Sequence, residues 1–220
     1  MDEIGYKAIY MDTDSIHTPF DDTNIDHINV VLNLLNLSYD DFALHHGIKH
    51  HVFRMEFDKI YRKAFYGKDV KKRYAGAISY KDGKSVDRLD IWGFEAKRSD
   101  TSEFSRNLQR TVFNMILREN KPKEEVLRYI GNEIDRIRRG KFQFSEIGIP
   151  KGMTKSIDGY GKIVNGMRVG IPANVRGAIY SRDVLGHVLS SKPKMLYVNK
   201  MPGEYPNTDV IAFDEDDQVP

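Results

Sequence analysis

Two acidic residues follow an apolar run near the start of the chain, and this pattern limits how the segment can fold. Residues 8–11 have the β-branched and aromatic character of a buried strand. Asp12 and Asp14 come next, separated by Thr13, and burying ionised carboxylates is costly unless a cation or strong donors meet them. We therefore expect a strand, a tight turn at the two acids and a second strand within residues 5–17.

The tip of such a hairpin can present Asp12 and Asp14 to a cation. Mg²⁺ prefers oxygen ligands and completes its shell with waters and substrate phosphates. Two such ions can activate a 3′-hydroxyl and stabilise a leaving pyrophosphate in nucleotidyl transfer. The alternative is a surface turn in which the two carboxylates cap local backbone amides. A D-x-D pattern by itself, without supporting motifs around it, favours this surface turn over a metal site.

The composition is typical of a soluble globular protein with two subdomains. The 220 residues are 40% hydrophobic and 30% charged, enough for a sizeable core. No apolar run approaches the length of a membrane span, and the N-terminus has no signal-peptide pattern, so we expect no membrane association. The absence of cysteine excludes disulfides and thiolate metal sites.

A basic segment occupies residues 59–73, although the net charge of the chain is only +2. Its one acidic residue is Asp69. The basic residues are Lys59, Arg62, Lys63, Lys68, Lys71, Lys72 and Arg73. This concentration predicts a local anion-binding surface. The alternative for the run at residues 71–73 is a charged edge strand that guards against aggregation.

Periodicity predicts a helix and three strands in the first half of the chain. Asn24 can cap a helix over residues 24–37, where apolar residues recur at helical spacing. Residues 52–66 and 74–80 have strand character, and a turn at residues 80–85 leads into a third strand. We therefore expect an α+β sheet unit.

The pattern changes near residues 97–100, where we place a boundary. Asp100 and Glu103 resemble a capping box ahead of an amphipathic helix. Residues 120–122 break this helix, and Pro122 opens a second one, which Gly140 ends. Frequent glycine and proline beyond this point predict loops with short strands. The second unit is therefore expected to be mainly helical with an irregular end.

Four segments together resemble one family. The stretch YMDTDS at residues 10–15 is similar to the third palm motif of family B DNA polymerases, Y-x-D-T-D-S. MEFDKIYRKAFYGKDVKKRYAG at residues 55–76 resembles that family's strand pair ending in K-K-R-Y. WGFEAKRSD at residues 92–100 and PANVRGAIYSRDVLG at residues 172–186 resemble its palm-to-thumb and thumb segments. Reverse transcriptases also carry a Y-M-D tip, but their acids are adjacent, so the intervening Thr13 argues against them.

The resemblance implies an α+β fold in two parts and the activity of a DNA-directed DNA polymerase. Residues 1–98 would form the C-terminal part of the palm, an antiparallel palm sheet with packed helices. Residues 99–220 would form the thumb, mainly helical with short irregular strands. Primer–template DNA and deoxynucleoside triphosphates would be the substrates.

The resemblance also assigns roles to the hairpin residues. Asp14 would be the direct ligand of two Mg²⁺ ions, for which Mn²⁺ can substitute. Asp12 would be a nearby secondary carboxylate that orients water or binds metal transiently. Thr13 and Ser15, with Tyr10, would hold the turn of the motif.

A second pair of acids, Glu56 and Asp58, alternates along the expected strand and would face one side of it. In the family an acidic pair at this place can hold an accessory ion. A solvated strand face is the alternative.

The basic residues would hold DNA of any sequence. A polymerase reads phosphates and groove shape, and Lys and Arg that neutralise phosphates release counterions. The residues expected to contact the primer–template backbone are Lys71, Lys72, Arg73 and Tyr74, extended by Lys97 and Arg98.

Two motifs of a complete family B polymerase are missing, namely the first palm motif, D-x-x-S-L-Y-P, and the fingers motif, K-x-x-x-N-S-x-Y-G. We therefore expect an N-terminal polymerase portion that carries both as a partner, and no activity of the chain alone. The chain is either the small subunit of a naturally split polymerase, which its start at Met1 favours, or a fragment of a longer chain.

The resemblance further implies a cytoplasmic location, in a prokaryote or in a virus-infected host cell, and a sliding clamp as a candidate partner. The alternative function is a non-catalytic DNA-binding or scaffolding module derived from a polymerase. The two acids at the tip favour catalysis, because a binding module has no use for closely spaced carboxylates that repel phosphate.

Overall fold

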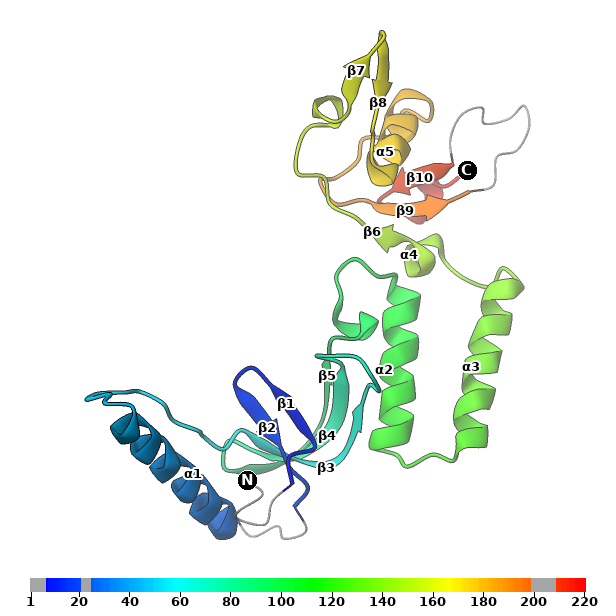
Figure 1. Ribbon diagram of the computed structural model, residues 1–220. Helices are drawn as coiled ribbons and strands as arrows, with labels where there is room; N and C mark the ends of the chain where they lie inside the picture. Colours follow the sequence, from blue (N-terminus) through cyan, green and yellow to red (C-terminus); the bar gives the residue numbers. More distant parts are fainter. Residues whose placement is uncertain (1–6, 21–24, 199–208) are drawn as a thin grey trace. The chain divides into compact units, whose positions relative to one another are not determined.

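The computed structural model describes residues 7–20, 25–198 and 209–220, which form two compact units, Met1–Asp90 and Ile91–Pro220 (Figure 1). The division falls at residue 90, ahead of the boundary predicted at residues 97–100, because the last strand of the first sheet continues directly into the second unit. Both units mix helices with antiparallel sheet. Within the described residues, no helix combines the length and the apolar character that crossing a membrane requires.

An antiparallel hairpin opens the first unit, as the sequence predicts. β1 (Tyr10–Asp12) pairs with β2 (Ser15–His17), and the register leaves Thr13 and Asp14 as the connection between them. Residues 5 and 6 of the predicted first strand lie outside the described residues, as does the predicted helix cap, residue 24.

The helix α1 (Ile25–His45) continues beyond the predicted range of 24–37. Its end is set by Gly47, whose φ of 68° is a left-handed conformation that glycine adopts without strain. The next amide, of Ile48, donates to the carbonyl of Ala43 at 2.8 Å, which is the pattern of a helix closed by a glycine. The prediction ended the helix too early because its apolar spacing fades well before this stop signal.

The first unit also contains a sheet with the strand order β3-β4-β5. Its strands are β3 (Lys59–Tyr66), β4 (Tyr74–Lys81) and β5 (Lys84–Trp92). β3 is antiparallel to β4, and the predicted turn between β4 and β5 is confirmed at Asp82 and Gly83. The central strand β4 supplies the buried core of the sheet with Ala75, Ala77 and Ile78.

The strand predicted from residue 52 begins only at Lys59. The side chain of Asn36, in α1, donates to the carbonyl of Met55 at 3.0 Å and accepts from its amide at 2.7 Å. The backbone amide and carbonyl of Met55 therefore form hydrogen bonds with the side chain of Asn36, whereas in a strand they would form hydrogen bonds with a neighbouring strand. Residues 52–58 run alongside α1 without joining the sheet.

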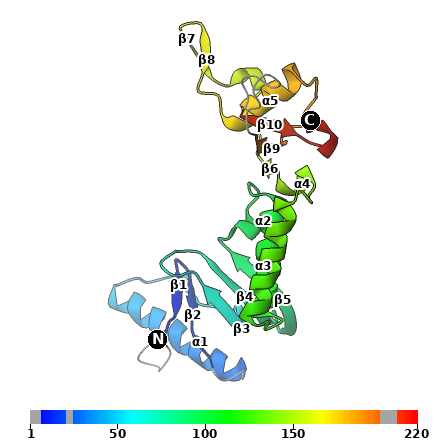
Figure 2. The same cartoon turned by 90° about the vertical axis from the view of Figure 1, so that its right-hand side faces the viewer.

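Two helices dominate the start of the second unit and lie side by side in both views (Figures 1 and 2). They are α2 (Glu103–Leu117) and α3 (Lys123–Arg138), preceded by the short helix η2 (Glu95–Lys97) and followed by α4 (Phe144–Ile147). The cap of α2 is Ser102, whose hydroxyl accepts from the amide of Ser105 at 3.3 Å. The predicted cap, Asp100, instead binds Arg98.

The break at residues 120–122 and the stop at Gly140 are confirmed. Asn120 and Gly140 both have positive φ, of 52° and 69°. Pro122 is the N-cap of α3, just before the first helical residue.

The rest of the second unit is a small α/β layer built on one buried helix. Its elements are β6 (Ile149–Pro150), η3 (Ile157–Gly159), β7 (Lys162–Val164), β8 (Met167–Val169), α5 (Ala173–Asp183), β9 (Lys194–Tyr197), β10 (Val210–Phe213) and η4 (Asp216–Gln218). β10, β9 and β6 form one sheet, and β7 pairs with β8 as a hairpin. Every residue of β10 is buried, and α5 packs against this strand.

The prediction of loops and short strands after residue 142 missed α5. A glycine, Gly177, lies inside this helix because a Cβ there would approach the Ala212 amide nitrogen to 2.9 Å. Ser181, fully buried, donates to the Ala212 carbonyl at 2.5 Å. Close packing on β10 thus stabilises a helix whose residues show little amphipathic pattern.

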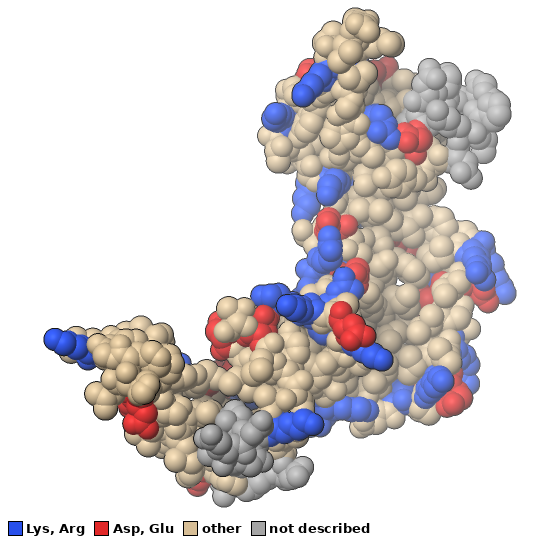
Figure 3. All heavy atoms as spheres, viewed as in Figure 1, with Lys and Arg blue, Asp and Glu red and all other residues tan. Residues whose placement is uncertain are grey.

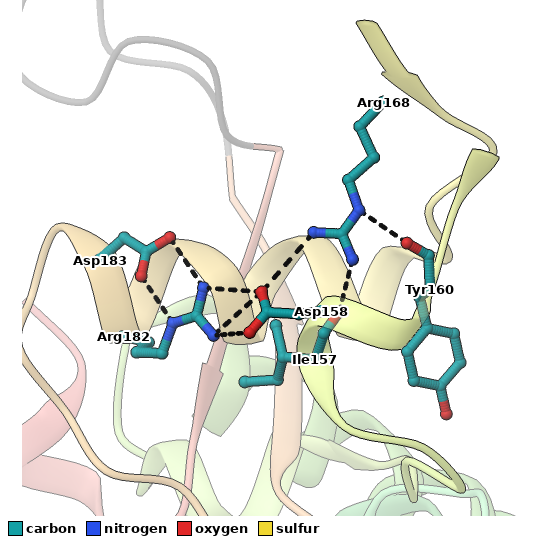
Figure 4. Close-up of polar contacts among 6 residues, drawn as sticks. All are labelled: Ile157, Asp158, Tyr160, Arg168, Arg182 and Asp183. Carbon is teal, nitrogen blue, oxygen red and sulfur yellow. Dashed lines mark hydrogen bonds and ion pairs between the residues drawn. The ribbon is translucent and has the colours of Figure 1, made fainter. Parts of the chain in front are cut away.

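An aspartate bound by two arginines ties η3 and β8 to α5 (Figure 4). Asp158 accepts from Arg182 at 3.2 Å and lies 3.8 Å from the guanidinium of Arg168. Arg168 also donates to the carbonyl of Tyr160 at 2.7 Å, so the base of the β7–β8 hairpin is fixed from both sides.

Candidate functional site

The turn between β1 and β2 is held by its own side chains. The Ser15 hydroxyl donates to the Asp12 carbonyl at 3.2 Å, and the Thr13 hydroxyl donates to the Asp12 carboxylate at 3.2 Å. Thr13 has a φ of 34°, a left-handed conformation that is strained for a β-branched residue. These contacts show Thr13 and Ser15 stabilising a turn that the backbone alone would not favour.

The two carboxylates of the hairpin have different surroundings. The side chain of Asp12 is 28% exposed, and its Oδ1 lies 3.3 Å from the Nζ of Lys72. Asp14 is exposed and, among the residues that the structure describes, makes no hydrogen bond or ion pair. Only Asp14 therefore offers both carboxylate oxygens to a ligand.

Tyr10 connects the hairpin to the basic segment. Its hydroxyl accepts a hydrogen bond from the Lys72 amide at 3.0 Å. Its ring packs against His17, Tyr66 and Tyr74, with ring centroids 5.2 to 5.4 Å away. The structure thus brings the predicted acids and the predicted DNA-binding segment together in one place.

Sequence reasoning missed His17 and Tyr66, whose side chains support the contact between Tyr10 and the basic segment. The Nδ1 of His17 lies 2.9 Å from the Tyr66 hydroxyl. Burial, followed by the nearby charge of Lys59, lowers the pKa of His17, and burial raises the pKa of Tyr66 to about 12. The available signal was that His17 lies directly opposite Tyr10 in a hairpin with a two-residue turn.

The connection between β3 and β4, residues 67–73, presents the basic run. Gly67 donates to the carbonyl of Arg73 at 2.8 Å, which closes the base of the loop. Lys72 has a φ of 60°, and both Lys71 and Lys72 are exposed. Arg73 and Tyr74 are half-buried at the point where β4 begins. The two lysines are therefore the members of the run that are available to an anion.

The second pair of acids binds lysine and arginine side chains. Asp58 lies 3.1 Å from the Nζ of Lys59 and 3.2 Å from that of Lys81. Burial opposes ionisation of Asp58, but hydrogen bonds from these lysines lower its pKa overall. Glu56 is exposed, 3.7 Å from Arg54. Both acids precede β3, so the expected strand face does not form there.

Lys59 belongs to a buried polar network, away from the exposed surface predicted for the basic segment. Its Nζ lies 2.9 Å from Asp90, which also accepts from the Tyr61 hydroxyl at 2.6 Å. Burial opposes the charged form, but the hydrogen bonds to Asp90 and Asp58 raise the pKa of Lys59. This lysine therefore has a structural role inside the sheet unit.

The remaining candidates, Lys97 and Arg98, lie in the second unit on η2 and just after it. Both are exposed. Arg98 donates two hydrogen bonds of 2.9 Å to Asp100, and these contacts lower the pKa of Asp100 to about 2.

The chain matches the model of DNA polymerase family B over residues 1–171. It is 30% identical to a DNA polymerase of Archaeoglobus fulgidus over 189 residues, 86% of this chain and 22% of that protein. It is 30% identical to DNA polymerase 2 of Aeropyrum pernix over 153 residues, 70% of this chain and 16% of that protein. With the DNA polymerase delta catalytic subunit of Glycine max the identity is 29% over 158 residues, 72% of this chain and 14% of that protein.

These similarities define a class, the DNA polymerases. The chain belongs to DNA polymerase family B, as the motif at Tyr10–Ser15 indicated. It spans less than a quarter of the length of each of these relatives.

Proposed function

We propose that the chain is the C-terminal palm and thumb portion of a family B DNA polymerase. Residues 1–98 would contribute the metal-binding carboxylates and part of the primer–template surface, and residues 99–220 the thumb. The observation that carries the proposal is the hairpin tip, where Asp14, without a partner among the described residues, lies beside an Asp12 that is joined to the basic segment through Lys72.

The donor set of the hairpin fits Mg²⁺ in chemistry. Asp12 and Asp14 offer carboxylate oxygens, which this hard cation prefers, and the exposed tip leaves room for waters and phosphates. When bound, two ions would supply activation of the primer 3′-hydroxyl and stabilisation of the leaving pyrophosphate. In the described part of the chain no cluster of three or more metal-ligating side chains occurs, so the rest of the site would come from another polypeptide segment.

The surroundings of the two acids support different roles for them. Asp14 has no competing cation among the described residues and would hold the metal directly. The Nζ of Lys72 already lies 3.3 Å from Asp12, so Asp12 would contribute to the electrostatic potential of the site from its edge. Lys72 itself can exchange this ion pair for a backbone phosphate, because its side chain is 68% exposed.

The basic segment would hold the primer–template close to the acids. Lys71 and Lys72 are exposed, and the Tyr10 hydroxyl fixes the backbone of Lys72 next to the hairpin. Contacts of this kind neutralise phosphates without reading bases, which suits a polymerase. A deoxynucleoside triphosphate and an N-terminal portion that carries the first palm motif and the fingers complete the proposed assembly.

Paramagnetic Mn²⁺ tests the metal site on the chain itself. Small additions of Mn²⁺ should broaden the backbone NMR signals of residues 12–15 before any others. Asp14→Asn should abolish this broadening, whereas Asp12→Asn should leave part of it, because Lys72 competes with the metal only for Asp12. Glu56→Gln is the matched control, since that acid lies next to Arg54. Broadening centred on Glu56 and Asp58, or broadening that Asp14→Asn leaves unchanged, would favour the non-catalytic DNA-binding module.

A further inference from the structure

Four aromatic rings join the β1–β2 hairpin to the strands β3 and β4. Tyr10 and His17 lie directly opposite each other in the hairpin, and Tyr66 and Tyr74 lie directly opposite each other where β3 and β4 meet their connection, residues 67–73. Every pair of these rings is in contact, with ring centroids 5.1 to 6.1 Å apart. The hairpin and the base of the connection therefore pack as one aromatic cluster.

A directional hydrogen bond lies inside this aromatic cluster. The Nδ1 of His17 is 2.9 Å from the Tyr66 hydroxyl, and both residues are half-buried. Packing alone allows a ring to turn or slide, whereas a hydrogen bond weakens steeply when its geometry is distorted. Burial lowers the pKa of His17, so the imidazole is neutral at about pH 7.5. The bond to Tyr66 therefore fixes the orientation of a neutral His17 ring.

The cluster ends at a lysine with an unusual backbone conformation. The Tyr10 hydroxyl accepts from the Lys72 amide at 3.0 Å, and the φ of Lys72 is 60°, which a side chain such as lysine adopts only at a cost. The Nζ of Lys72 lies 3.3 Å from Asp12. Acidic side chains mark the exposed tip of the hairpin in the space-filling view (Figure 3). The place of the Lys72 ammonium beside these acids thus depends on where the Tyr10 ring is held.

We propose that His17 is a positioning residue for the DNA contact of Lys72, an inference that rests on the proposed function. His17 holds the Tyr10 ring from the opposite strand and is itself fixed by Tyr66, the last residue of β3. With the Tyr10 ring in place, its hydroxyl keeps the Lys72 backbone in the left-handed conformation. Fixing a binding group in advance lowers the entropic cost of meeting a phosphate. The effect of His17 on DNA binding therefore passes through Lys72.

His17→Phe tests this role because it keeps an aromatic ring and the neutral charge while removing Nδ1. Solvent exchange of the Lys72 amide, measured by NMR at about pH 7.5, should become roughly two- to tenfold faster, as expected for the loss of one neutral hydrogen bond. Ile78→Val is the matched control, because it trims a fully buried side chain of β4 and lowers stability without touching the cluster. This control should leave the exchange of the Lys72 amide unchanged.

Tyr66→Phe removes the other partner of the same hydrogen bond. It should speed the exchange of the Lys72 amide as much as His17→Phe does. The double variant should exchange no faster than either single variant, because one shared bond can be lost only once. Effects that add in the double variant would show that the two side chains act independently, and would overturn the proposal.

Duplex affinity shows whether His17 acts through Lys72. For a labelled duplex of mixed sequence, His17→Phe should lower the affinity of the chain roughly two- to tenfold. The slope of log affinity against log salt should stay the same, since no charge is lost. In a Lys72→Gln background, His17→Phe should cause no further loss of affinity. A loss of the same size in that background would contradict a role that passes through Lys72.

Two further outcomes separate this inference from the proposed function. A wild-type chain that binds no duplex would refute the proposed function together with the DNA contact of Lys72. A chain that binds duplex, and in which His17→Phe changes neither the exchange of the Lys72 amide nor the affinity, would refute the positioning role alone.

Discussion

At the scale of single residues, the Tyr10 hydroxyl joins two features that the sequence predicts separately. The hairpin acids and the basic run are far apart in the chain, and no local pattern says that they meet. The bond from the Lys72 amide to Tyr10 and the ion pair from Lys72 to Asp12 are tertiary contacts between strand β1 and the connection from β3 to β4. Sequence reasoning therefore indicated the side chains of the candidate site but not the contacts between them.

The dependence on tertiary contacts also explains why the sequence did not indicate His17. His17 shows no motif of its own, and its importance comes from burial between the rings of Tyr10, Tyr61, Tyr66 and Tyr74. The resemblance implies an accessory metal ligand at Asp58, and the Nζ atoms of Lys59 and Lys81 lie 3.1 and 3.2 Å from its carboxylate. Residue types and their spacing indicate which side chains could bind a ligand. The fold determines which partners those side chains already have.

His17 should make folding stability depend on pH. Burial, followed by the charge of Lys59, lowers its pKa below the ordinary 6.5, so the unfolded chain binds the proton more readily than the folded one. Stability is therefore fully present above about pH 6.5 and falls as the pH drops towards the folded pKa. Urea unfolding at about pH 7.5 and about pH 5.5 measures the difference.

His17→Gln should reduce the stability lost between these two pH values. His50→Gln is the control, because His50 is exposed and makes no described side-chain contact. An undiminished pH dependence in His17→Gln would show that other groups cause it.

At the scale of secondary-structure elements, the sequence predicted those with a clear start or stop signal. The turn at residues 80–85, the break before Pro122 and the stop at Gly140 were all correct, because proline, glycine and turn residues act locally. The helix α5 was missed because its stability comes from packing on β10. The prediction of a strand over residues 52–58 was wrong because the backbone there bonds to the side chain of Asn36 in α1, and a local sequence pattern does not indicate such a tertiary contact.

Two glycines within helices of the second unit should respond to alanine in opposite directions. A Cβ added at Gly131, inside α3, would meet no described atom within 4 Å, so Gly131→Ala should raise the free energy of unfolding by about 0.5–1 kcal/mol. A Cβ added at Gly177, inside α5, would lie 2.9 Å from the Ala212 amide nitrogen, so Gly177→Ala should lower it by about 1–3 kcal/mol. Thermal unfolding measures both, and a stabilising Gly177→Ala would contradict the described packing of α5 on β10.

At the scale of the whole molecule, the family was readable from the sequence because Y-x-D-T-D-S and K-K-R-Y are contiguous motifs in a fixed order. The placement of residues 1–98 in a palm and 99–220 in a thumb stays a proposal. The compact units divide instead at residue 90. The chain spans 22%, 16% and 14% of the polymerases of Archaeoglobus fulgidus, Aeropyrum pernix and Glycine max, and the sharing of a catalytic site with another polypeptide segment likewise stays a proposal.

The most direct test of this account is single-turnover nucleotide incorporation by the chain together with the N-terminal polymerase portion that carries the first palm motif and the fingers. The chain alone should extend no primer. In the complex, Asp14→Asn should nearly abolish incorporation at every Mg²⁺ concentration, because it removes the charge that fixes the ions and stabilises the transferring phosphoryl group. Asp12→Asn should leave measurable activity, and both variants should still bind primer–template. If Asp14→Asn kept its activity while Asp12→Asn lost it, or if both lost DNA binding instead of chemistry, the role proposed for this hairpin would be wrong.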